Sequence, residues 1–135
     1  MDPDLEQLVW RRANGLCEYC RMPQAVHPWP FQIDHIIAQQ HHGETVPENL
    51  ALSCLRCNSH KGPNLSGYDW MTNEVVRLFH PRRDAWDEHF VWDGPRLRGR
   101  TQIGRVTIDV LTINDPSYVE LRESLIAEGL FPPKT

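Results

Sequence analysis

Residues 31–62 read FQIDHIIAQQHHGETVPENLALSCLRCNSHKG, and the fold is decided within this stretch. Its first part, over 31–38, is apolar and β-prone, but an acid and a histidine interrupt it side by side at Asp34 and His35. Neighbouring residues of a strand point to opposite faces, so one site can use both side chains only at a bulge or at the strand's end. We therefore expect irregular geometry at this pair.

The second part of the stretch brings the chain back and then starts a helix. After a polar turn, residues 49–53 are expected to form a second strand. Cys54 and Cys57 follow, and the polar run over 58–61 is expected to form the first turns of a helix that stops near Gly62. The pattern predicts two strands and a helix, with two cysteines at the junction.

The four cysteines of the chain form two Cys-x-x-Cys pairs. Cys17 and Cys20 lie upstream of the stretch, and 33 residues separate Cys20 from Cys54, which pairs with Cys57. Such pairs place thiolates so that they meet one zinc ion, and in a reducing compartment metal binding is favoured over disulfides. We predict a structural zinc ion held by these four residues.

Asp34, His35 and Asn58 together predict the hydrolysis of a phosphodiester. A histidine with an unperturbed pKa of about 6.5 can accept a proton from water near neutral pH. A hard cation such as Mg²⁺ or Mn²⁺, held by the carboxylate of Asp34 and the amide oxygen of Asn58, can bind the phosphate and neutralise the leaving oxygen. Two protein ligands leave other positions on such a cation open for substrate and water.

These residues resemble the motifs of the HNH endonucleases, the ββα-metal group. The resemblance rests on Cys17/Cys20, Asp34-His35-Ile36, Asn49-Leu50 and Cys54-Leu55-Arg56-Cys57-Asn58-Ser59-His60-Lys61. It implies that His35 is the general base, that Asp34 and Asn58 hold the catalytic cation, and that Asn49 secures the loop that orients His35. It also implies cleavage of nucleic acid that leaves a 3′-hydroxyl.

The resemblance extends into the second half of the chain. The segment from Leu78 to Arg82, followed by Trp86, His89-Phe90 and Gly104-Arg105, is similar to the tail of a bacterial HNH subgroup. The chain departs from the family's usual pattern at Gln39, where a proline is common, and at His42-Gly43, where two glycines are common. Neither departure falls on a predicted ligand, so both concern the shape of the loop.

Nucleic acid, DNA above all, is the expected partner, although the net charge of the chain is −4. Four arginines and no acid lie between Gly94 and Ile108, so phosphate contact is locally favoured. Contacts with phosphate are predicted for Arg56 and Lys61 and, in this second cluster, for Arg96, Arg98 and Arg100.

The predicted fold class is α+β, a small zinc-stapled ββα-metal core with additional helices and a C-terminal extension. One domain is expected over 1–135, with its core at about 17–62 and its extension at about 63–135. The extension and the N-terminus are expected to contain helices over 4–14, 81–88, 102–113 and 115–129, a strand over 75–79, and a hairpin of 89–92 with 96–99. Residues 65–71 are expected to be irregular.

The sequence contains no secretory signal and no apolar run long enough to span a membrane. We therefore expect a cytoplasmic protein without a membrane partner. The sequence indicates no oligomeric state.

Two other readings stay open from the residues alone. A zinc module that binds nucleic acid without cleaving it would explain the cysteines but would not need Asp34, His35 and Asn58. A zinc deaminase would use His42-Gly43-Glu44 with Cys54 and Cys57, but it would leave Cys17 and Cys20 unexplained. His60 lies two positions after Asn58 and is either a further ligand, a phosphate contact or a surface residue.

Overall fold

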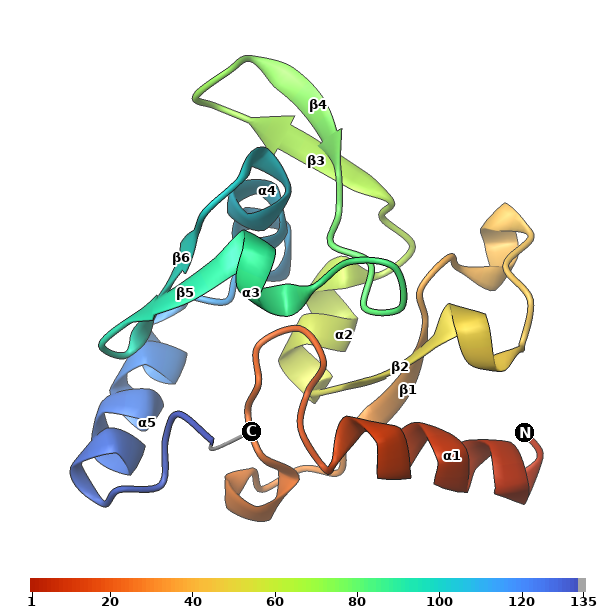
Figure 1. Cartoon of the computed structure of the whole chain (residues 1–135), viewed down its shortest axis with the longest axis horizontal. Coiled ribbons are helices and arrows are strands. Elements are labelled where there is room, and N and C mark those ends of the chain that lie inside the picture. The colour runs from red at the N-terminus through yellow and green to blue at the C-terminus, as the bar shows by residue number, and fades with distance from the viewer. Residues whose placement is uncertain (134–135) are drawn as a thin grey trace.

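The structure is a computed structural model that describes residues 1–133, and its ribbon is drawn in Figure 1. The helices are α1 (Pro3–Ala13), α2 (Leu55–Lys61), α3 (Trp86–His89), α4 (Gln102–Leu111) and α5 (Pro116–Ala127), with short 3₁₀ turns η1 (Gln24–Val26), η2 (Gln39–His41) and η3 (Pro47–Asn49). The strands are β1 (Gln32–His35), β2 (Leu50–Ser53), β3 (Ser66–Asp69), β4 (Glu74–Arg77), β5 (Phe90–Asp93) and β6 (Arg96–Gly99). Within residues 1–133 the strands pair as three antiparallel hairpins, β1–β2, β3–β4 and β5–β6. The α+β fold class is confirmed.

Helix α1 begins and ends one residue before the predicted range of 4–14. The carboxylate of Asp2 accepts a hydrogen bond from the backbone N–H of Asp4 at 2.8 Å, and Pro3 occupies the first turn. The helix ends at Asn14, which adopts the left-handed conformation with φ of 54°. Val9 and Ala13 form the buried face of α1, which packs against β2.

Strand β1 ends at His35, so the expectation of irregular geometry at this position is confirmed. Within β1, Asp34 pairs with Ala51 of β2 and His35 pairs with Leu50. The chain then bends at the next two residues. Helix α2 starts earlier than predicted, at Leu55, because Cys54 is its N-cap and its sulfur accepts a hydrogen bond from the backbone N–H of Cys57. The predicted order of two strands and a helix is present.

The prediction that residues 65–71 are irregular is wrong, because Ser66–Asp69 form strand β3 and pair with β4. The stretch is polar and contains Gly67, so it carries little strand signal of its own. Gly67 is required by packing, since a Cβ at this position would lie 2.6 Å from Val110 Cγ2 and 2.7 Å from Val106 Cγ1 of α4. The strand is therefore specified by its partner helix.

Helix α4 connects the extension to the core. Figure 1 shows α4 beside the β3–β4 hairpin, the β5–β6 hairpin and α2, and the three elements pack against it. Buried apolar residues from Val9 on α1 to Phe131 near the C-terminus belong to a single hydrophobic cluster. This shared core favours the prediction of one domain, which stays a prediction. In the part of the chain that the structure describes, the helices are too short or too polar to cross a bilayer.

We predict that Gly104→Ala destabilises the fold, because α4 lies in close contact with α3 and β6 at this residue. An added Cβ would lie 2.1 Å from the carbonyl oxygen of His89 and 3.1 Å from the Cα of Gly99. Overpacking of this kind lowers the free energy of unfolding by about 1–3 kcal/mol. Urea unfolding measures the change, and Asp109→Ala on the exposed face of the same helix is the control. Equal stability of Gly104→Ala and wild type would contradict the packing described.

Candidate metal and nuclease site

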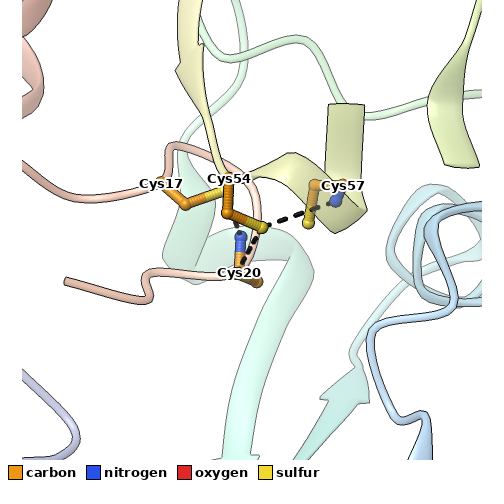
Figure 2. Close-up of side chains that lie close together, drawn as sticks. All are labelled: Cys17, Cys20, Cys54 and Cys57. Atoms are coloured by element: carbon orange, nitrogen blue, oxygen red, sulfur yellow. Dashed lines mark hydrogen bonds between the residues drawn. The ribbon is translucent and has the colours of Figure 1, made fainter. Parts of the chain in front are cut away.

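The four cysteine sulfurs converge at one point. Their Sγ atoms lie within 4.8 Å of one another, and all four residues are buried. Figure 2 shows Cys17 and Cys20 on the loop after α1, facing Cys54 and Cys57 at the start of α2. A tetrahedral zinc ion with Zn–S bonds of about 2.3 Å requires sulfurs about 3.8 Å apart, and the sulfurs of Cys20 and Cys54 are 3.8 Å apart. The donor set and its geometry fit a structural zinc ion.

Backbone and side-chain contacts prepare the sulfurs for a cation. The N–H of Cys20 donates to the sulfur of Cys17 at 3.5 Å, and the N–H of Cys57 donates to the sulfur of Cys54 at 3.4 Å. Hydrogen bonding with Cys17 raises the pKa of Cys20 and of Cys57 and lowers the pKa of Cys54. Thiolates held this close repel one another, and a bound cation removes that repulsion.

Asp34 is buried between α2 and the loop that carries Cys17 and Cys20. It is 6% exposed, and its Oδ2 accepts a hydrogen bond from the hydroxyl of Tyr19 at 2.7 Å. The ammonium of Lys61 lies 3.1 Å from the same oxygen and also donates to the carbonyl oxygen of Ile36 at 3.0 Å. Burial raises the pKa of Asp34, and the charge of Lys61 acts in the opposite direction. Tyr19 and Lys61 thus fix the carboxylate from two sides.

Asn58 lies at the same interface between β1 and α2. Its Nδ2 donates to Oε1 of Gln32 at 2.6 Å. Gln32 and Asp34 are two residues apart on β1 and share a face, as Asn58 and Lys61 do on α2. Asp34 and Asn58 therefore lie on the two elements of one interface, and their joint binding of a cation stays a prediction. In the described chain, Oδ1 of Asn58 has no hydrogen-bond donor, so this oxygen is available to a cation.

His35 follows Asp34 on the alternate face of β1, and it is partly exposed. Its Nε2 lies 2.9 Å from the hydroxyl of Thr45 in the loop that returns to β2. In residues 1–133 the ring makes no hydrogen bond to Asp34 or to Asn58. His35 thus follows Asp34 directly in the sequence, but its ring contacts Thr45 and not the carboxylate of Asp34.

Asn49 secures the loop that follows His35. Its Oδ1 accepts from the backbone N–H of Ile37 at 2.8 Å, while its Nδ2 donates to the carbonyl oxygens of Ile37 and Glu44 at 3.0 and 2.9 Å. The loop is also closely packed, because a Cβ on Gly43 would lie 1.7 Å from the carbonyl oxygen of Ile37. This geometry agrees with the role that the HNH resemblance implies for Asn49.

The structure revises the prediction for Lys61. Its side chain is buried, and its ammonium is used by Asp34 and by backbone carbonyls of β1 and the bend after it. A phosphate on the surface cannot reach this ammonium. Lys61 therefore has a structural role, as the counter-charge of Asp34.

Arg56 and His60 lie on another face of α2. Arg56 forms an ion pair with Asp115 at 3.4 Å and lies over the ring of Tyr118. His60 is two positions, or about 200° around the helix, from Asn58, and its ring contacts Thr112 at 3.3 Å. The structure therefore directs His60 toward α4 and away from the interface of Asp34 and Asn58.

The three predicted arginines of the extension lie on or just after β6. Arg96 and Arg98 are exposed, Arg98 pairs with Asp93 at 3.2 Å, and Arg100 donates to the carbonyl oxygen of Asp87. Figure 1 shows the β5–β6 hairpin on the other side of α2 and α4 from the loop after β1. That these arginines contact nucleic acid stays a prediction. They lie on a surface separate from that of His35.

Sequence reasoning missed three side chains of the site: Tyr19, Gln32 and Thr45. Gln32 could have been found, because its spacing of two residues from Asp34 puts both on one face of a strand. Tyr19 lies inside the first Cys-x-x-Cys pair, and nothing in that motif indicates a contact 15 residues away. Thr45 stands in a polar loop without a local signal.

Comparison with known proteins agrees with this geometry. The family model described as HNH endonuclease matches residues 17–64. Septu protein PtuA of Bacillus mycoides (strain KBAB4) is 26% identical over 149 aligned residues, which cover 92% of this chain and 21% of PtuA. Septu protein PtuB of Bacillus thuringiensis is 25% identical over 114 residues, which cover 83% of this chain and 42% of PtuB. The chain thus spans less than half the length of either relative, and no solved structure matches it.

We predict that Cys54→Ser removes the bound zinc and lowers the melting temperature, because one of the four sulfur donors is lost. Ser59→Ala, on the exposed face of α2, is the matched control and should change neither quantity. Metal content by mass spectrometry and thermal unfolding are the measurements. A serine variant with unchanged zinc content and melting temperature would exclude the four-cysteine site.

We predict that Lys61→Met lowers the free energy of unfolding by about 3–5 kcal/mol, because the carboxylate of Asp34 is left buried without its counter-charge. Adding Asp34→Asn should restore part of this loss, since no buried charge then remains. Urea unfolding of the two single variants and the double variant completes the cycle. Additive losses in the double variant would mean that the pair is not coupled.

Proposed function

We propose that this chain is a metal-dependent endonuclease that hydrolyses phosphodiester bonds, with DNA as the preferred substrate, because residues 17–64 match the family model described as HNH endonuclease. The observation that carries the proposal is the junction of β1 and α2. There the carboxylate of Asp34 and the amide of Asn58 share an interface, and His35 follows on the same strand, in front of a loop that Asn49 secures.

His35 is the proposed general base. With the ring proton on Nε2 donated to the hydroxyl of Thr45, Nδ1 is unprotonated and can take a proton from the attacking water. The hydrogen bonds of Asn49 restrict the loop that carries Thr45, so the ring is held in one orientation. Orientation of the base lowers the entropy cost of reaching the transition state.

Asp34 and Asn58 are the proposed ligands of a catalytic Mg²⁺ or Mn²⁺ ion. Both offer oxygen donors, which hard cations prefer, and Oδ1 of Asp34 retains one lone pair beyond those that accept from Tyr19 and Lys61. When bound, the cation would stabilise negative charge on the phosphate and on the leaving oxygen. Lys61 holds the carboxylate in place, which is the usual role of a residue behind a metal ligand.

A zinc module that binds nucleic acid without cleaving it remains the competing function. It accounts for the cysteines, but it gives no reason for the buried carboxylate and the three hydrogen bonds of Asn49. Cleavage by the purified chain decides between the two.

We predict that His35→Ala reduces the cleavage rate by about 10²–10⁴-fold, the usual contribution of a general base. Zinc content and melting temperature should stay at wild-type values, because the side chain lies partly exposed at the strand's end. Conversion of supercoiled plasmid to nicked and linear forms is the readout, and His41→Ala on the exposed turn η2 is the control. Cleavage by His35→Ala at the wild-type rate would remove His35 from the mechanism.

We predict that cleavage requires added Mg²⁺ or Mn²⁺ even when the cysteine site is fully loaded with zinc, because sulfur and oxygen donors select different cations. Asn58→Ala should raise the Mg²⁺ concentration needed for half-maximal rate by about tenfold or more, since an oxygen donor is lost. Full activity with zinc alone would argue against the proposed cation site.

A further inference from the structure

A groove of about 340 Å³ opens directly beside the residues that follow His35. It is lined by the bend at Ile36 and Ile37 and by residues of the segment from Arg77 to Arg83. The end of α2 at Lys61 and the chain after it, Asn64 and Leu65, complete the lining. The groove therefore begins at the two residues that directly follow His35, where β1 ends.

The ionisable side chains that line this groove are all of the basic type, and they lie among apolar ones. Arg77, His80 and Arg83 line it together with the buried Lys61, and no acidic side chain is among its lining residues. This is unexpected for a chain with 18 acidic and 14 basic residues. A groove lined by one sign of charge attracts a ligand of the opposite charge.

Arg83 carries the charge that is available to a ligand. It is exposed, and it forms no ion pair with any residue of the described chain. Arg77 donates two hydrogen bonds to Asp84, at 2.7 and 2.9 Å, and Lys61 is paired with Asp34. Arg83 is therefore the cation of the groove that is free to meet a phosphate.

The turn that carries Arg83 is held rigidly. Asp84 accepts from the backbone N–H of His80 at 2.9 Å as well as from Arg77, and the N–H of Arg83 donates to the carbonyl oxygen of His80. After the turn, Nε1 of Trp86 donates to the carbonyl oxygen of Tyr19 at 2.9 Å, in the first Cys-x-x-Cys pair. The segment is thus anchored to the cysteine site, and the position of Arg83 is set in advance of binding.

His80 adds a neutral hydrogen-bond donor to the lining of the groove. Its Nδ1 accepts from the backbone N–H of Arg82 at 3.2 Å, so in the neutral ring the proton is on Nε2. Burial and the nearby charge of Arg83 lower the pKa of His80. A neutral imidazole and a guanidinium can together bind the oxygens of a phosphate backbone.

We infer that this groove is a binding site for the sugar–phosphate backbone of the substrate strand next to the scissile bond, with Arg83 as its phosphate contact. The inference rests on the proposed function, because it identifies the surface that delivers a strand to His35. It also gives a role to the Leu78–Arg82 segment and the turn after it, which the chemistry at Asp34 and Asn58 does not use.

Binding measured without cleavage tests the inference. Fluorescence anisotropy with a labelled DNA duplex and a labelled single strand, in the His35→Ala background without added divalent cation, reports affinity alone. Arg83→Ala should weaken binding of at least one of the two DNA probes about tenfold, the value of one charge-assisted hydrogen bond. It should also reduce the slope of log affinity against log salt by about one. Arg83→Gln, which keeps a polar side chain but removes the charge, should show the same loss.

Arg11→Ala, an exposed arginine of α1 outside the groove, is the matched control and should bind as the background protein does. Unchanged affinity and salt slope in Arg83→Ala, or an equal loss in Arg11→Ala, would overturn the inference. Full cleavage by the His35→Ala protein would instead refute the proposed general base, and the binding comparison would still decide on the groove.

Discussion

The convergence of four thiols is the constraint on which the rest of the structure depends. Two of them come from a loop after α1 and two from the start of α2, with 33 residues between the pairs. A metal ion bound by all four thiols would close this long loop, and its binding free energy would add to that of hydrophobic burial in folding. Closing the loop also fixes the β1–β2 hairpin between its ends, and this hairpin carries Asp34 and His35.

The cysteine loop reaches the candidate nuclease site through one side chain. Tyr19 lies between Cys17 and Cys20, and its hydroxyl donates to Asp34 while its backbone carbonyl accepts from Trp86. Tyr19, in the loop that carries Cys17 and Cys20, thus contacts both the carboxylate of Asp34 and the extension. Displacement of this loop would shift the carboxylate of Asp34 through the one contact and the turn that carries Arg83 through the other. The extension is therefore part of the same packed unit as the site.

Sequence patterns predicted the parts of the site that have a fixed spacing. The cysteine pairs follow from their spacing, and the irregular geometry after Asp34 and His35 follows from the strand pattern, although the strand was expected to extend to residue 38. The loop bonds of Asn49 agree with what the HNH resemblance implies. Strand β3 was missed because its stability comes from α4, which packs on Gly67 from about 40 residues further along the chain. Lys61 was misassigned because a lysine is usually exposed, and only the position of α2 against β1 shows that its ammonium is buried.

The burial of Lys61 has a consequence for any cation at Asp34. A carboxylate that already serves an ammonium at 3.1 Å can give a second cation only part of its charge. Binding there would be weaker than at a free carboxylate, and it would depend on oxygens of the substrate to complete the coordination, as Mg²⁺ sites on phosphates commonly do. The four-sulfur site needs no such help, since its donors are complete and buried. One metal would then stay with the fold, while the other would bind strongly only when a phosphate is present.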